Sequence, residues 1–158
     1  MYSEEAWRQQ GMRVLPACEL SFMDLLRRWG VDREFSLQMV PAFWPWPMDF
    51  FHMQQGYFVQ VDGRCHWVAM YHHSTWVVLW RDMMQNMAAV QQGGRLVRVH
   101  TEDLGNADCI AVALESAAMG YTLVLTPSYS TALVRWGSFD VPYLQLLKLL
   151  VPNCQGHT

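Results

Sequence analysis

The sequence predicts a single α+β domain over residues 1–158, in which helices flank an antiparallel sheet formed by a meander of strands. Three observations predict this class. Helical patterns come first, strand patterns follow, and a helix, a strand and a helix end the chain. The length of 158 residues fits one domain. A hydrophobic content of 52% with only 16% charged residues is typical of a packed core and excludes disorder.

Helical patterns open the chain. Residues 3–10 form an amphipathic start, and residues 18–29 follow the three-to-four spacing of one helix face, with Gly30 as the C-terminal stop. Asp32 is placed to cap a short helix over residues 33–39. These segments predict the helical layer that covers the sheet.

The segment PAFWPWP, residues 41–47, contains three prolines and cannot form regular structure. It displays Trp44 and Trp46 between the prolines. We favour a packed crossing loop over a recognition surface, and we expect at least one of these two tryptophans to be partly exposed.

The middle of the chain predicts three consecutive antiparallel strands. The runs GYFVQV (56–61), CHWVAMY (65–71) and WVVLW (76–80) are rich in aromatic and β-branched residues and are separated by short turns. We expect Trp67 and Trp76 to be buried in this sheet.

Strand and helix patterns alternate in the rest of the chain. We expect strands over residues 95–100, 121–127 and 132–136, and helices over residues 107–119 and 141–152. Asn106 or Asp108 would cap the first of these helices. The alternation in RLVRVH (95–100) predicts a strand with one face in water.

Composition excludes several classes of function. A net charge of −3, from 11 basic and 14 acidic residues, argues against a basic nucleic-acid surface. No apolar run approaches the ~20 residues of a membrane span, and the first ten residues lack the apolar segment of a secretory signal. We therefore expect an intracellular, cytoplasmic protein that contacts neither nucleic acid nor membrane.

The sequence predicts no metal and no cofactor. The pairs Cys65-His66 and His72-His73 are adjacent in sequence, so on strands their side chains would point to opposite faces. Gly93-Gly94 is not followed by the Lys and Ser/Thr of a phosphate-binding loop. The four cysteines have no paired spacing, and we interpret them as free thiols.

One group of residues has the pattern of a cysteine nucleophile with its helpers. Cys18 stands at the predicted N-terminus of a helix, where a thiolate is stabilised. His66 begins a predicted strand as a candidate base, and Asp82 follows the next strand as a candidate orienting acid. The alternative is that Cys18 is a core residue and His66 a hydrogen-bonded strand-end residue.

The stretch GYFVQVDGRCHWVAMYHHSTWVVLW resembles the Josephin deubiquitinases, which are papain-like cysteine peptidases. The shared pattern is an apolar strand, a His-Trp pair, a short turn and a strand that starts with Trp. The resemblance implies a papain-like arrangement, a Cys18–His66–Asp82 site and a ubiquitin-like protein partner. Three positions depart from the pattern. Alignment of the helix by Leu25-Leu26 places the nucleophile at Ala17 or Cys18. Position 13 is Arg where Josephin domains carry a Gln, and the orienting position falls on Trp80, two residues before Asp82.

Three functions therefore stay open. The first is a non-catalytic, Josephin-like interaction or scaffold domain that binds a protein through an aromatic and Met-rich surface, with Trp44, Trp46 and Trp67 as contact residues. The second is a small cysteine peptidase or deubiquitinase that cleaves ubiquitin-like tails. The third is a structural domain in which His and Cys are incidental. Eight Trp and eleven Met favour the first function, because these residues are enriched at interfaces.

Overall fold

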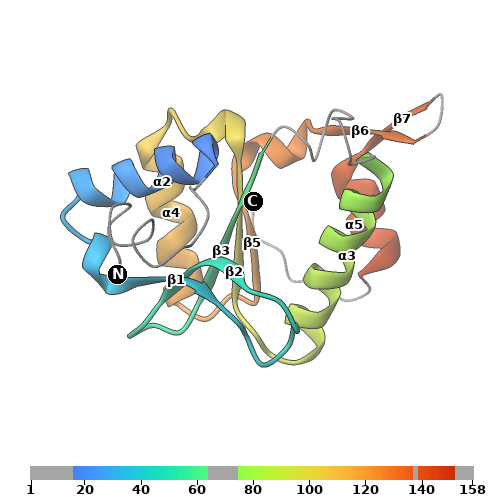
Figure 1. The fold of residues 1–158 in the computed structure, drawn as a ribbon. Coiled ribbons are helices and arrows are strands. Elements are labelled where there is room, and N and C mark those ends of the chain that lie inside the picture. The colour runs from blue at the N-terminus through green and yellow to red at the C-terminus, as the bar shows by residue number, and fades with distance from the viewer. Residues whose placement is uncertain (1–15, 64–74, 137–138, 152–158) are drawn as a thin grey trace.

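A computed structural model describes residues 16–63, 75–136 and 139–151 (Figure 1). Two helical layers enclose a five-stranded sheet, with α2 and α4 on one face and α3 and α5 on the other. The helices are α2 (Ala17–Arg28), α3 (Thr75–Gln91), α4 (Ala107–Ala118) and α5 (Tyr143–Leu150), with short 3₁₀ turns η1 (Asp32–Glu34), η3 (Thr101–Asp103) and η4 (Pro127–Ser130). The strands are β1 (Phe35–Met39), β2 (Met48–His52), β3 (Phe58–Asp62), β4 (Leu96–His100), β5 (Leu123–Leu125), β6 (Leu133–Trp136) and β7 (Phe139–Pro142). The predicted α+β class is confirmed.

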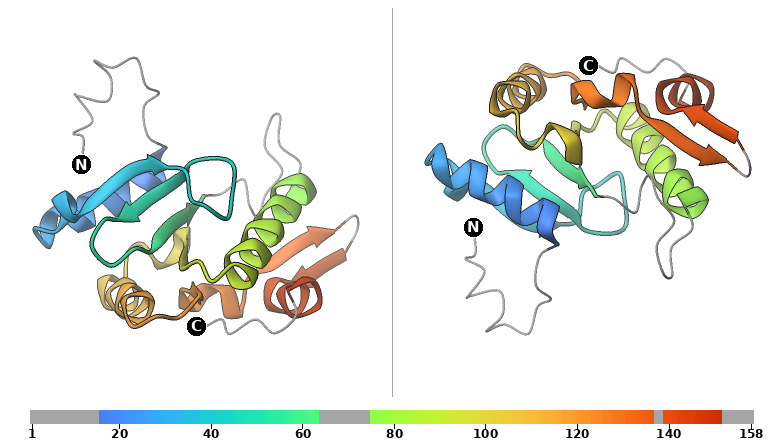
Figure 2. Two further views of the ribbon diagram at one scale, coloured as in Figure 1. Left: turned by 90° about the horizontal axis from the view of Figure 1, so that it is seen from below. Right: turned by 90° about the horizontal axis from the view of Figure 1, so that it is seen from above.

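The sheet is mixed, with the strand order β1-β2-β3-β4-β5. The first three strands form an antiparallel meander, whereas β3, β4 and β5 run parallel to one another. The expectation of a purely antiparallel sheet is therefore wrong. Parallel neighbours need a crossover connection, and α3 and α4 supply the two crossovers. Strands β6 and β7 form a separate hairpin beside α3 and α5, which both views of Figure 2 show.

The predicted strand over residues 76–80 is wrong, because this segment is the first part of α3. A run of five apolar residues fits either a strand or a buried helix. Burial beyond the run indicates a helix. Leu79, within the run, and Met83, after it, are four residues apart and both are 2% exposed, which is the spacing of one helix face. The predicted strand over residues 65–71, the helix over residues 3–10 and the burial of the Trp67 and Trp76 side chains all lie outside the described residues.

Capping explains why two of the helices were predictable. Pro16 precedes α2, and Gly30 follows it with a positive φ of 71°, a backbone conformation that glycine adopts without strain. At α4, the Asn106 side chain accepts a hydrogen bond from the Cys109 N–H, as the sequence predicted for one of two candidate caps. The short helix expected over residues 33–39 is wrong: η1 ends at Glu34 and β1 follows.

A separate apolar core lies on each face of the sheet. The core under α2 and α4 includes Phe22, Leu26, Phe50, Val59 and Ile110, all fully buried. The core under α3 and α5 includes Leu79, Met83, Leu96, Leu123 and Leu147. Successive residues of β3 and β4 point into opposite cores, so these two strands join them. Across the residues that the structure describes, no helix is both long enough and apolar enough to span a membrane.

Candidate functional site

Residues 40–47 connect β1 to β2, and we call this segment the aromatic loop. Phe43 fixes it to the domain, because its ring is 8% exposed and packs edge-on against Phe58 with centroids 5.7 Å apart. Gly94 makes this packing possible, since a Cβ at that position would lie 2.5 Å from the Phe43 ring. Trp44 is half-buried, and its ring lies 5.7 Å from that of Trp46.

The outer surface of the aromatic loop is apolar. Trp46 is 62% exposed, which confirms the expectation that at least one of the two tryptophans is partly exposed. At the same end of the β1–β2 hairpin, Met39 is 41% and Val40 is 54% exposed. Prolines at positions 41, 45 and 47 restrict the backbone of the loop. The loop therefore presents a large aromatic side chain on a stiff support.

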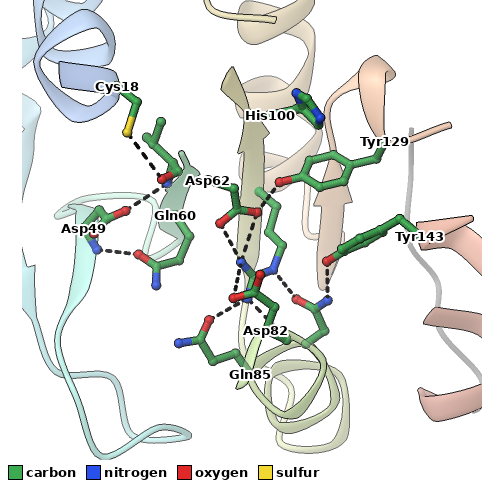
Figure 3. A network of polar contacts seen from close by, with 12 residues as sticks. Cys18, Asp49, Gln60, Asp62, Asp82, Gln85, His100, Tyr129 and Tyr143 are labelled. Atoms are coloured by element: carbon green, nitrogen blue, oxygen red, sulfur yellow. Dashed lines mark hydrogen bonds and ion pairs between the residues drawn. The ribbon is translucent and has the colours of Figure 1, made fainter. Parts of the chain in front are cut away.

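A buried polar network lies on the opposite side of β3 from α2 (Figure 3). At its centre Arg98, in the middle of β4, is fully buried. Its Nη1 atom lies 2.9 Å from Asp62 Oδ1 and 3.5 Å from Asp82 Oδ1. Its Nη2 atom donates to the Asp82 carbonyl and to the Gln85 side chain, and its Nε atom donates to Asn86 Oδ1. All three guanidinium nitrogens therefore form hydrogen bonds or ion pairs with other residues of the domain.

Two buried tyrosines complete this network. The Tyr129 hydroxyl donates to Asp62, and Asn86 Nδ2 donates to the Tyr143 hydroxyl over 3.1 Å. Burial raises the pKa of both tyrosines above the usual range. Burial alone would lower the pKa of Arg98, but its two carboxylate partners raise that pKa well above its ordinary value. The network therefore holds an ionised arginine and neutral tyrosines, an arrangement that joins β3, β4, α3, η4 and α5.

The structure does not bring the predicted orienting acid to the predicted nucleophile. Asp82 lies in α3 and forms an ion pair with Arg98, whereas Cys18 lies at the start of α2 on the other face of the sheet. The strand that was expected to carry the acid is a helix, and this is the physical reason for the difference. His66 and Trp67 lie outside the described residues.

Cys18 is held against the end of β3. Its sulfur lies 4.0 Å from the Val61 carbonyl oxygen, and a Cβ at Gly63 would come within 3.1 Å of it. Burial, followed by the nearby Glu19 and Asp49 carboxylates, raises the pKa of the Cys18 thiol to about 11. The helix N-terminus was expected to favour the thiolate, and these larger effects outweigh it.

We predict that Cys18 reacts slowly with iodoacetamide at pH 7. A rise in pKa from 9.0 to about 11 lowers the thiolate fraction about 100-fold, and the thiolate is the reactive form. The measurement is the alkylation rate of a variant in which the other three cysteines are serine, with free N-acetylcysteine as the reference. The rate should keep rising with pH until about pH 11. A plateau below pH 8 would show an activated nucleophile instead.

Sequence reasoning missed the polar pair next to Cys18. The Asp49 N–H donates to Gln60 Oε1, and the Val61 N–H donates to Asp49 Oδ2, both over 2.9 Å. These side chains replace backbone pairing where β2 and β3 separate. Gln38, in the neighbouring strand β1, lies opposite Asp49 and has a φ of 54°. The backbone of β1 is therefore irregular at the same level of the sheet. No periodicity in the sequence signals this arrangement.

Polar groups at the carboxyl ends of the parallel strands β4 and β5 also form hydrogen bonds within the domain. The His100 N–H donates to Thr126 Oγ1 over 2.9 Å, and the His100 ring accepts from the Glu102 N–H. The Ser128 hydroxyl donates to Asp103 over 2.5 Å. Within the described ranges, no three His, Cys, Asp or Glu side chains lie close enough to hold a metal ion.

Comparisons with protein-family models, with curated proteins and with solved structures find no match to this chain.

Proposed function

We propose that this chain is a non-catalytic protein-binding domain that engages its partner through the aromatic loop. The proposal depends on the exposure of Trp46, whose surface is 62% accessible to solvent. Met39 and Val40, at the same end of the β1–β2 hairpin, are exposed too. Exposed apolar residues that lie together are typical of interaction sites. Tryptophan is also the residue type most enriched among those that dominate binding energy.

The support beneath Trp46 favours tight binding. Its ring already packs against Trp44, and the buried Phe43 ring fixes the loop to Phe58. A side chain that is ordered before it binds loses less conformational entropy on binding. The aromatic loop therefore needs little rearrangement to accept a partner.

The polar groups of the described residues support a function without catalysis. Asp82 stabilises the buried Arg98. Partial burial with the nearby Glu19 and Asp49 carboxylates keeps Cys18 as a protonated thiol. A cysteine nucleophile needs the opposite, namely a lowered thiol pKa.

The Josephin-like relationship remains a prediction, because it depends on residues 56–80 and residues 64–74 lie outside the described part. As part of this proposal it suggests ubiquitin as the first partner to test. Addition of unlabelled ubiquitin to the isotope-labelled domain should then shift the NMR signals of the aromatic loop. If ubiquitin shifts none of them, the partner belongs to another class of protein.

We predict that a photo-crosslinking amino acid at position 46 captures a protein partner in the cells that produce this chain naturally. The matched control is the same crosslinker at Trp80, which is 47% exposed on α3. Position 80 lies about 17 Å along α3 from Gln91, the end of the helix that leads to Gly94. Gly94 packs against Phe43 of the aromatic loop, so position 80 is the more distant site. One protein should be captured from position 46 and not from position 80. Capture of the same proteins from both positions would contradict the assignment to the aromatic loop.

A further inference from the structure

A pocket of about 220 Å³ lies between α4 and the last strand of the sheet, β5. In the strand order β1-β2-β3-β4-β5, it adjoins the edge opposite to β1 and the aromatic loop. The pocket is therefore independent of the function proposed above. Its lining residues are Asp108, Cys109, Val112, Ala113, Val124, Leu125, Thr126 and Pro127.

The walls of the pocket are apolar. Val112 and Ala113 come from α4, and Val124 and Leu125 come from β5. Val112 is 56% exposed, so the pocket leaves an apolar side chain open to solvent. A cavity of about 150 Å³ lined by aliphatic side chains takes up benzene. A pocket of this size and lining accommodates one aromatic ring.

The lining of the pocket includes one carboxylate. Asp108 lines it as an exposed carboxylate and makes no ion pair with any residue that the structure describes. Residues 101–126, which include α4 and β5, contain four acids and neither Lys nor Arg. A cationic group on a ligand would therefore find a carboxylate beside the apolar walls and no basic side chain from this segment.

We propose that this pocket binds a small aromatic amine. The ring lies against Val112, Ala113 and Val124, and the ammonium group pairs with the Asp108 carboxylate. The apolar walls supply most of the affinity, and the carboxylate selects a cation over a neutral or anionic analogue.

The test uses benzylamine as the probe and the intact chain, isotope-labelled for NMR. Benzylamine at neutral pH should shift the amide signals of Ala113 and Val124, with a dissociation constant of about 1 mM. Asp108→Asn should weaken binding about threefold, as expected for one exposed ion pair. Glu115→Gln is the matched control, because Glu115 is exposed on the same helix and does not line the pocket, and it should leave the constant unchanged.

Two further experiments distinguish the contribution of the apolar walls to binding from that of the Asp108 charge. Val112→Trp should block the pocket and weaken benzylamine binding at least tenfold, and the exposure of residue 112 makes it a substitution that the fold tolerates. Benzyl alcohol should bind more weakly than benzylamine, and benzoate should bind most weakly. The proposal is overturned if benzylamine leaves the Ala113 and Val124 signals unmoved, or if Asp108→Asn and Glu115→Gln have equal effects.

Discussion

Replacement of Arg98 by methionine is expected to lower the free energy of unfolding by about 3–5 kcal/mol. The substitution keeps a long side chain but removes the charge that compensates Asp62 and Asp82, both of which are buried. It also leaves the side-chain oxygens of Gln85 and Asn86 without their donor in Arg98. Urea denaturation of both proteins at pH 7 measures the difference.

Arg81→Met is the matched control for this experiment. Arg81 lies on the exposed side of α3, and surface substitutions of this kind usually change stability by less than about 0.5 kcal/mol. If Arg98→Met costs no more than Arg81→Met, the buried network does not hold β4 to α3 in the way described above.

Trp46→Ala is expected to weaken partner binding at least about 30-fold, which corresponds to about 2 kcal/mol. The change removes the most exposed ring of the aromatic loop and leaves the buried Phe43 anchor in place. The free energy of unfolding should therefore change little. The measurement is calorimetric titration of wild type and variant with the partner captured from position 46.

Trp80→Ala is the matched control for Trp46→Ala. Both residues are tryptophans with large exposed fractions, 47% and 62%, but only Trp46 belongs to the aromatic loop. Trp80→Ala should leave the dissociation constant within about threefold of wild type, as is usual for residues outside the energetic centre of an interface. Equal losses from the two variants would place the contact surface elsewhere.

Local signals in the sequence were sufficient for some elements. Helices α2 and α4 were predictable because their apolar spacing is bounded by Pro16 and Gly30 in one case and by Asn106 in the other. Strands β3 and β4 were predictable from dense β-branched residues. In contrast, β1 and β2 are short strands in which Ser36, Gln38 and Asp49 interrupt the apolar residues, and the sequence does not predict them.

The buried network could not be predicted because its partners are far apart in the chain. Arg98 and His100 alternate with apolar residues, a pattern that predicts a face in water, yet both side chains are buried. Asp62, in β3, precedes Arg98 by 36 residues, and Tyr129 follows Asp62 by 67 residues. Only the parallel pairing of β3 with β4 brings these groups together. The parallel pairing itself depends on α3, and the sequence pattern predicted a strand over residues 76–80, the first part of this helix.

The central claim is that the domain binds its partner without catalysis. It is tested most directly by the mass of the captured partner after incubation with an equal amount of wild type or of Cys18→Ser. We predict an unchanged mass in both samples, because the Cys18 thiol is partly buried and its raised pKa keeps it protonated near neutral pH. A partner that wild type cleaves and Cys18→Ser leaves intact would contradict this account and establish the domain as a cysteine peptidase.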